Sequence, residues 1–180
     1  MPFRSIYLAK SRGVSSQRFH FGIFIPNQAC DRDTIADDYR RYETLGTVLH
    51  VVGEPLMAGF VFEIKRNFDG QHENELKQLV LLGKIDVANI HDPTSKMDTK
   101  EDIPRSIVER HAASVPPPPR GQNIRAPIDG VNTRRCQEWT MDVLTLLAEK
   151  HLISEDAVRI AEEERDPPTH GIFGYNNQHS

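Results

Sequence analysis

Residues 134–152, RRCQEWTMDVLTLLAEKHL, decide the fold class, because they predict the most regular helix of the chain. Asn132 and Thr133 stand directly before this stretch and belong to the residue types that cap helix N-termini. The apolar side chains of the stretch recur at helical spacing on one stripe: Cys136, Trp139, Val143, Leu144 and Leu147. A helix with one apolar stripe needs another element to cover it, so we expect it to pack against a sheet.

The first half of the chain supplies the strands for such a sheet. Runs rich in aromatic and β-branched residues, or alternating between apolar and polar residues, predict four strands. They are residues 3–9, 19–25, 47–53 and 59–66. Residues 76–90 fit either a helical turn or a kinked strand, and we favour a strand because the strands before it need neighbours. Residues 28–44 are polar and charged, with a helical turn or two around Thr34–Tyr42.

The second half of the chain predicts helices on both sides of a proline-rich connection. A helix over residues 98–113, capped by Thr99, precedes Pro116–Pro119, which favour polyproline geometry. We interpret this segment as a structural connection, and a docking site for a partner is the alternative. After the helix of residues 134–152, Ser154 is positioned to cap one further helix.

This order of elements predicts an α+β fold. The expected architecture is an antiparallel sheet of about four or more strands, packed with the helix that carries Cys136 and with one or two further helices. The length of 180 residues suits a single domain. We place that domain at residues 1–165 and expect a flexible C-terminal tail over residues 166–180.

The composition disfavours several classes of function. Lys plus Arg number 22 and Asp plus Glu number 26, and the net charge of −4 is unfavourable for a nucleic-acid partner. No stretch approaches the roughly 18 apolar residues of a membrane span. The N-terminal residues lack the apolar core of a signal peptide, so we expect a cytoplasmic protein. No HExxH motif and no glycine-rich phosphate loop occurs, so we expect no metal and no cofactor.

The two cysteines, Cys30 and Cys136, cannot form a disulfide framework or a four-thiolate zinc site. Cys30 follows a predicted strand in a polar loop, and we interpret it as incidental. Cys136 is either a buried packing residue beside Trp139 or a nucleophile. Its place in the first turn of a helix, directly after Arg134 and Arg135, favours the thiolate over the thiol.

Two of the eight histidines, His20 and His50, stand among apolar residues of predicted strands. Most of the others lie in polar or loop contexts. A single histidine in a strand is usually part of the packing. Two histidines in strands that can pair, together with a cysteine at a helix start, indicate a base that could activate Cys136.

Three short motifs carry a family resemblance. His20 stands in FHFGIFI, His50 in TVLHVVG and Cys136 in RRCQEW. In this order they resemble the strand motif His-Trp-Ala-Ile-Tyr-Val, the second strand motif Val-Ile/Val-His and the motif Asn-Cys-Glu-His-Phe of the LRAT-like and NlpC-related superfamily. That superfamily has a circularly permuted papain-like fold, in which the histidine strands precede the cysteine helix.

The resemblance implies a role for each of the three residues. Cys136 would be the nucleophile, His20 its general base and His50 the group that orients His20. The implied reaction is attack on the carbonyl of an amide, ester or thioester to give an acyl-enzyme, followed by transfer to water or another acceptor. The backbone N–H of Cys136 is the expected donor to the oxyanion.

The chain also departs from the family pattern. Arg135 stands where relatives often have Asn, and Glu138 and Trp139 replace the usual His-Phe. The loop over residues 27–46 is longer than in the lipid acyltransferases, and the chain has no membrane-anchoring tail. We therefore expect a soluble small-molecule or peptide substrate, a ubiquitin-like isopeptide included, rather than a phospholipid or peptidoglycan.

Two other functions stay open. The first is a non-catalytic binding protein that keeps the fold and uses the pocket or the proline segment. The second is a cyclase or isomerase of a metabolite pathway, in which His20 transfers a proton without an acyl-enzyme; the general character of the chain resembles small fungal proteins of that kind. A His20 nitrogen within hydrogen-bond reach of the Cys136 thiol, with His50 on its other side, is the geometry that favours the nucleophile.

Overall fold

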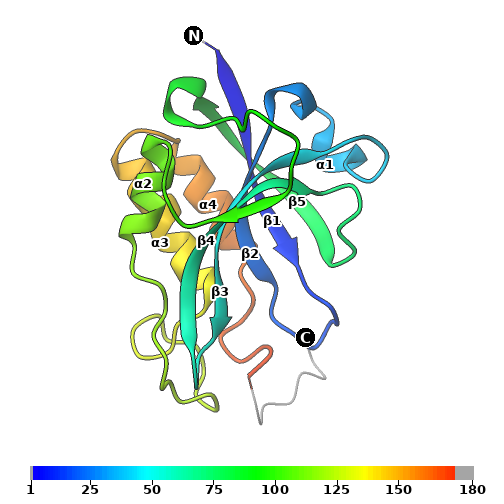
Figure 1. Ribbon diagram of the computed structural model, residues 1–180. Helices are drawn as coiled ribbons and strands as arrows, with labels where there is room; N and C mark the ends of the chain where they lie inside the picture. The colour runs from blue at the N-terminus through cyan, green and yellow to red at the C-terminus, as the bar shows by residue number, and fades with distance from the viewer. Residues whose placement is uncertain (1, 173–180) are drawn as a thin grey trace.

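Six strands form one antiparallel sheet in the order β5-β1-β2-β3-β4-β6. The computed structural model describes residues 2–172, and Figure 1 shows the arrangement of their elements. The strands are β1 (Phe3–Ser11), β2 (His20–Pro26), β3 (Leu45–Glu54), β4 (Gly59–Asp69), β5 (Leu76–Asp86) and β6 (Thr99–Glu101). The N-terminal strand lies inside the sheet because β1 pairs with both β2 and β5.

Helices cover the two faces of the sheet unequally. They are α1 (Ile35–Asp38), α2 (Ile107–Ser114), α3 (Cys136–Glu149) and α4 (Glu155–Glu163), with short 3-10 turns at Gln28–Cys30 and Val87–Asn89. In Figure 1, α2, α3 and α4 lie together on one face, and α1 lies apart from them. The predicted α+β class is therefore confirmed, with the helix of Cys136 and two further helices on one side of the sheet.

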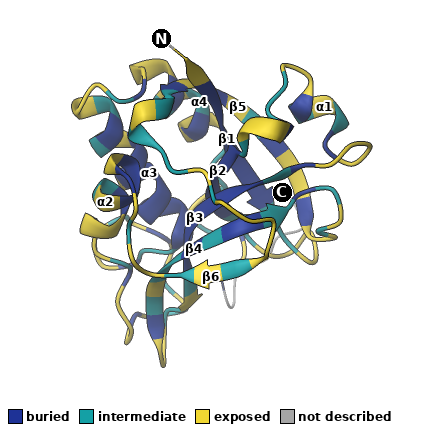
Figure 2. Ribbon diagram, turned by 45° about the horizontal axis from the view of Figure 1, so that its top comes forward, coloured by how far each residue is buried: buried dark blue, intermediate teal, exposed yellow. Residues whose placement is uncertain are grey.

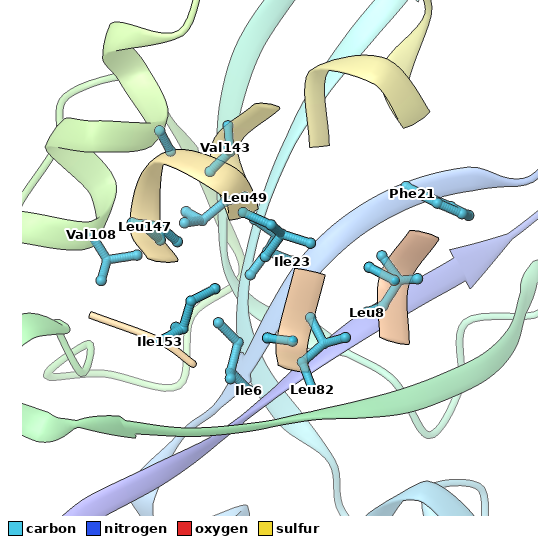
Figure 3. Close-up of a cluster of buried hydrophobic side chains, with 14 of the residues drawn as sticks. Ile6, Leu8, Phe21, Ile23, Leu49, Leu82, Val108, Val143, Leu147 and Ile153 are labelled. Atoms are coloured by element: carbon cyan, nitrogen blue, oxygen red, sulfur yellow. The ribbon is translucent and has the colours of Figure 1, made fainter. Parts of the chain in front are cut away.

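The alternation of side chains along the central strands builds a core on each face. Phe21, Ile23 and Ile25 of β2 join the larger cluster against α2, α3 and α4. Figure 3 shows part of this cluster, with Ile23 and Leu49 of the sheet beside Val143 and Leu147 of α3. Phe24 belongs to the smaller cluster on the opposite face, with residues of α1. Figure 2 shows the central strands buried and the edge strand β6 more exposed.

The helix predicted from residues 134–152 forms as expected. Its stripe is buried throughout: Cys136, Trp139, Val143, Leu144 and Leu147. The Nε1–H of Trp139 donates to the carbonyl of Val115 at 3.0 Å, so the start of the proline-rich connection is attached to α3. Residues 116–119 contain no helix or strand, as predicted, and the amide of Phe60 donates to the carbonyl of Pro118.

The strand predictions are confirmed, including the strand within residues 76–90, and the helix predicted at residues 98–113 begins later. Thr99–Glu101 pair with β4 as strand β6, so Thr99 is not a helix cap. The cap of α2 is Ser106, whose hydroxyl accepts from the amide of Glu109 at 3.2 Å. The free edge of β4 offers unpaired backbone groups, and pairing with that edge prevails over the local helical pattern.

The caps predicted for α3 are also wrong. Arg135 occupies the N-cap position, and its backbone N–H donates to the carboxylate of Glu138 at 2.8 Å. Thr133 is used within the preceding loop, where its hydroxyl donates to the carbonyl of Pro127 at 2.6 Å. Asn132 lies in the same loop, and its backbone N–H donates to Oδ1 of Asp129 at 2.7 Å.

The chain after α4 does not leave the domain at residue 166. The carboxylate of Asp166 accepts from the backbone N–H of Phe19 at 2.7 Å, and the carbonyl of Pro168 accepts from the amide of Ile128. His170 and Ile172 are buried. Residues 166–172 are therefore anchored to the domain, because their polar groups are paired with the start of β2 and the loop before α3. The rest of the expected tail, residues 173–180, lies outside the described residues.

Among the helices of residues 2–172, none is both long enough and apolar enough to cross a membrane.

Candidate active site

The three predicted site residues lie on three neighbouring elements. His20 is the first residue of β2, His50 lies within β3, and Cys136 is the first residue of α3. β2 and β3 are paired, and α3 packs against both strands. The start of β2 therefore lies between the second histidine and the cysteine.

His20 and His50 are in direct contact. Nε2 of His20 lies 2.8 Å from Nδ1 of His50, and the two rings meet edge to face with their centroids 5.0 Å apart. On the far side, Nε2 of His50 lies 2.9 Å from Oε1 of Glu63. The three side chains thus form one hydrogen-bonded chain, His20–His50–Glu63, that crosses β2, β3 and β4.

The sheet register explains this chain. His50 and Glu63 are directly opposed in the β3–β4 ladder, so their side chains stand on the same face as neighbours. His20 shares a face with Gly22, two residues further along β2. A Cβ at Gly22 would lie 2.9 Å from Cγ1 of Val48 and 3.7 Å from Cβ of His50. A side chain at this position would therefore collide with Val48 beside His50.

The chemistry of the carboxylate fixes the hydrogen positions along the chain. An ionised carboxylate only accepts, so Nε2 of His50 carries the hydrogen donated to Glu63. In the neutral ring Nδ1 of His50 is then an acceptor, and Nε2 of His20 must be the donor. Nδ1 of His20 is left with a free lone pair. This hydrogen-bonded chain therefore ends at Nδ1 of His20, which can accept a proton.

Both histidines are neutral in the folded protein. The pKa of His20 is lowered to about 3. Burial is the largest cause, the charges of His50 and Lys65 act in the same direction, and the charge of Glu63 opposes them. Burial also lowers the pKa of His50 to about 3, with the charges of Lys65 and Lys100 acting in the same direction. The contact between His50 and Glu63 is therefore a hydrogen bond to a carboxylate and not an ion pair near neutral pH.

Cys136 is buried against the start of β2. Its side chain is part of a residue only 9% exposed, and Sγ donates to the carbonyl of Phe19 at 3.8 Å. Among the described residues no hydrogen bond joins Sγ to a ring nitrogen of His20. The thiol is thus bonded to the main chain on the sheet face that α3 covers, whereas the ring of His20, which alternates with Phe21, stands on the opposite face with His50.

The expected preference for the thiolate is wrong for this arrangement. Burial raises the pKa of Cys136 to about 11, since removing the thiolate from water outweighs the neighbouring N–H groups and Arg18. Arg134, expected beside the thiol, instead forms an ion pair with Asp142. Arg135 does line the same pocket as Cys136.

His20 and Cys136 nevertheless share a pocket. A pocket of about 430 Å³ is lined by both residues, together with Phe60, Glu75 and other side chains at the ends of β1, β2 and β3. A second pocket, of about 360 Å³, is lined by His20 and His50. The two pockets have Ser11, His20, Gly53, Phe60 and Glu75 in common, so His20 lies where they adjoin.

A polar network holds the start of β2 against α3. The Nε2 group of Gln137 donates to the carbonyl of Phe19 at 3.0 Å and to Asp166 at 2.8 Å. Asp166 also accepts from the amide of Phe19. Phe19, which precedes His20, is therefore held to Gln137, which follows Cys136, both directly and through Asp166.

Sequence reasoning missed Glu63, Gln137 and Asp166. Glu63 has a usable signal, because it alternates with the apolar residues of a predicted strand and could be paired opposite His50. Asp166 has none, since its contact with β2 joins positions 147 residues apart. Cys30 lies beyond the other end of β2 and is buried rather than in an exposed loop, with Sγ donating to Glu43 at 3.8 Å.

Residues 2–172 contain no group of three or more His, Cys, Asp or Glu side chains that could hold a metal ion. The elements of chemical interest are therefore the histidine–carboxylate chain and the thiol at the helix start.

The fold and the site together define an α+β protein with a neutral His–His–Glu chain and a cysteine at a helix start. His20 of that chain and the cysteine line one pocket. The chain belongs to DUF6540, a family of unknown function, whose sequence model matches residues 6–154. This match includes His20, His50, Glu63 and Cys136 and ends before Asp166. No curated protein and no solved structure matches the chain.

Proposed function

We propose that this protein is a cysteine-dependent hydrolase or acyltransferase of the permuted papain-like type, acting in the cytoplasm on a soluble small-molecule or peptide substrate. The observation that carries the proposal is that His20, with its free Nδ1, and Cys136 line the same pocket. His50 and Glu63 are positioning residues, because they set the tautomer and orientation of His20 and do not line that pocket.

The proposed reaction starts from a neutral thiol. His20 and Cys136 stand on opposite faces of the sheet, so the thiol must leave the carbonyl of Phe19 and turn round the start of β2 when substrate binds. The S–H proton then passes to Nδ1 of His20 as sulfur attacks the substrate carbonyl. The carbon–sulfur bond forms and the carbonyl π electrons move to oxygen. The backbone N–H of Cys136, in the first turn of α3, donates to this oxyanion.

Collapse of the tetrahedral intermediate completes the first half. The carbonyl re-forms, the bond to the amine, alcohol or thiol leaving group breaks, and that group takes the proton from His20. Water or another acceptor then attacks the thioester and gives its proton to His20, and the same proton returns to the sulfur when the acyl group leaves. Hydrolysis and acyl transfer differ only in this acceptor.

A second function is favoured by one observation. The thiol of Cys136 has a raised pKa and is bonded to main chain, whereas Nδ1 of His20 is free. His20 could then move a proton within a bound substrate, as in a cyclisation or isomerisation, with no bond to sulfur. In that case Cys136 would contribute packing at the pocket wall.

Activity of matched variants separates these functions. The wild-type chain would be screened against thioesters, peptides and ubiquitin-like conjugates, followed by Cys136→Ala, His20→Gln and the control Cys30→Ala. We expect turnover that is lost in Cys136→Ala and His20→Gln and kept in Cys30→Ala. Activity that survives Cys136→Ala but not His20→Gln would support proton transfer instead. No turnover with any acyl donor would contradict the acyl-enzyme function.

A further inference from the structure

The pocket shared by His20 and Cys136 carries an excess of positive charge. Its lining residues include Arg12, Arg18 and Arg135, and Glu75 is the one acidic residue among those described. The whole chain, in contrast, has a net charge of −4. Since both histidines and the thiol are neutral near neutral pH, the three arginines determine the sign of the field in this pocket.

Within residues 2–172, Arg135 forms no ion pair. It is half-buried, none of its guanidinium nitrogens has an ion pair or hydrogen bond among residues 2–172, and Nη1 is fully buried. Its neighbours Arg18 and Glu138 act on it only at longer range. A partly buried cation without a partner is unfavourable by itself, so its retention in the pocket wall indicates an anionic partner from outside the chain.

Arg18 is only partly neutralised. Its side chain is nine-tenths buried, and its Nη2 lies 3.3 Å from the carboxylate of Glu138. Nη1 also donates to the carbonyl of Pro167 at 2.9 Å, and Nη2 donates to Oε1 of Gln137 at 3.0 Å. Glu138 also accepts from Arg165 at 2.9 Å, so two guanidinium groups share one carboxylate. The Nε–H of Arg18 is buried and has no acceptor among the described residues. Both Nη groups of Arg18 are therefore used within the protein, and Arg135 is the arginine of this pocket wall whose guanidinium has no partner among residues 2–172.

We infer that the pocket takes an anionic substrate, one whose carboxylate or phosphate is bound by Arg135 a few bonds away from the carbonyl that Cys136 attacks, with the charge of Arg18 beside it. Guanidinium groups bind both anions through paired N–H donors, which gives orientation as well as affinity. Because Arg135 directly precedes Cys136 in the chain, an anion held by Arg135 would lie close to the thiol. The inference rests on the proposed function for the acyl chemistry, but the anion site itself can be tested without turnover.

Alkylation of Cys136 by a charged and a neutral reagent tests the anion site. Iodoacetate and iodoacetamide both form a carbon–sulfur bond with the thiolate and release iodide, and they differ in the carboxylate. Because both consume the same thiolate, the ratio of their rates at one alkaline pH cancels the ionisation of Cys136. Peptide mass analysis after alkylation gives the rates for Cys136 and Cys30 separately.

We expect the iodoacetate-to-iodoacetamide ratio at Cys136 to fall about tenfold in Arg135→Gln, a charge-assisted pair being worth about that factor. Arg135→Lys should keep most of the preference. The matched control is Arg134→Gln, which removes the same charge one residue earlier from a side chain that does not line the pocket. An equal fall in Arg134→Gln, or no fall in Arg135→Gln, would overturn the inference.

Ligand-induced stabilisation gives a readout that does not depend on the thiol. Inorganic phosphate and succinate, each compared with sodium chloride at equal ionic strength, should raise the Tm of the wild type and of Arg134→Gln but not of Arg135→Gln. A rise with only one of them identifies the preferred anion. No rise with either, together with an unchanged alkylation ratio, refutes the anion site. If the site passes while no acyl-enzyme forms, only the proposed function fails.

Discussion

Nε2 of His50 lies 2.9 Å from Oε1 of Glu63, and the two residues are directly opposed in the β3–β4 ladder. The residue paired with His50 in this ladder is a carboxylate. Glu63 therefore determines which ring nitrogen of His50 carries the hydrogen. Through His50 the same contact makes Nδ1 of His20 the free base of the pocket. Glu63, at one end of the hydrogen-bonded chain His20–His50–Glu63, thus sets the tautomer of His20 at the other end.

Glu63→Gln should reduce activity without disrupting the fold. A glutamine side chain can donate as well as accept, so it no longer enforces the hydrogen on Nε2 of His50, and the tautomer of His20 becomes mixed. We expect kcat to fall about 10- to 100-fold, with a smaller effect on KM. The nitrogen chemical shifts of the two histidines report the tautomers directly. Glu155→Gln, an exposed position on α4, is the charge-matched control and should leave both readouts unchanged.

Acid should destabilise this protein through its two buried histidines. The pKa of each falls from about 6.5 when unfolded to about 3 when folded, so the unfolded chain binds more protons between these values. Their contribution to the free energy of unfolding is complete above about pH 6.5 and is lost as the pH falls towards 3, by at most about 1.4 kcal/mol per pH unit for each histidine.

Denaturant unfolding of the wild type and of His50→Gln over this range checks the effect. The difference in stability between the two proteins should shrink as the pH falls. A difference that stays constant would mean that folding does not lower the pKa of His50.

Cys136 should react slowly with iodoacetamide at neutral pH. Burial raises its pKa to about 11, so the thiolate is scarce until the pH approaches that value. We expect the alkylation rate of the native protein to rise through about pH 11 and to be slower near neutral pH than that of the unfolded chain. Rapid, selective labelling at mildly acidic pH would contradict this and would show a resting thiolate beside a protonated histidine.

Leu144→Ala should destabilise the fold because α3 is held to the sheet by its apolar stripe. Leu144 is fully buried, and truncation of such a leucine costs about 2–5 kcal/mol. Leu81 on β5 is 46% exposed, and Leu81→Ala should change the free energy of unfolding by only about 0.5 kcal/mol. Equal effects in chemical denaturation would contradict the assignment of α3 to the main core.

Periodicity was sufficient to predict the elements that matter most. The stripe of α3 is a local pattern with the burial that it predicts, and the aromatic and β-branched run of residues 19–25 forms the strand β2 that its composition predicts. The strand Thr99–Glu101 was not predictable in this way, because it depends on the free edge of β4 and its own residues fit a helix. The cap of α3 likewise depends on the loop before it, which uses Thr133 for its own turn.

The candidate site was likewise predictable from the sequence only where local patterns reveal it. His20, His50 and Cys136 are recognisable because their types are unusual in their local contexts. The state of the thiol was not predictable from the dipole and the arginines alone, because it depends on how deeply α3 buries Cys136 against Phe19. The carboxylate of Asp166, which fixes the start of β2, comes from a segment that the sequence suggested to be a tail.

Trapping of an acyl-enzyme tests the central claim most directly. The wild type, Cys136→Ala, His20→Gln and Cys30→Ala would be mixed with p-nitrophenyl acetate, quenched in acid and analysed by intact and peptide mass spectrometry. We expect one acetyl group on the peptide that contains Cys136 in the wild type and in Cys30→Ala, none on that peptide in Cys136→Ala, and much slower acetylation in His20→Gln. Turnover of the ester with no acetyl group on Cys136, or acetylation that is unaffected by His20→Gln, would contradict the account.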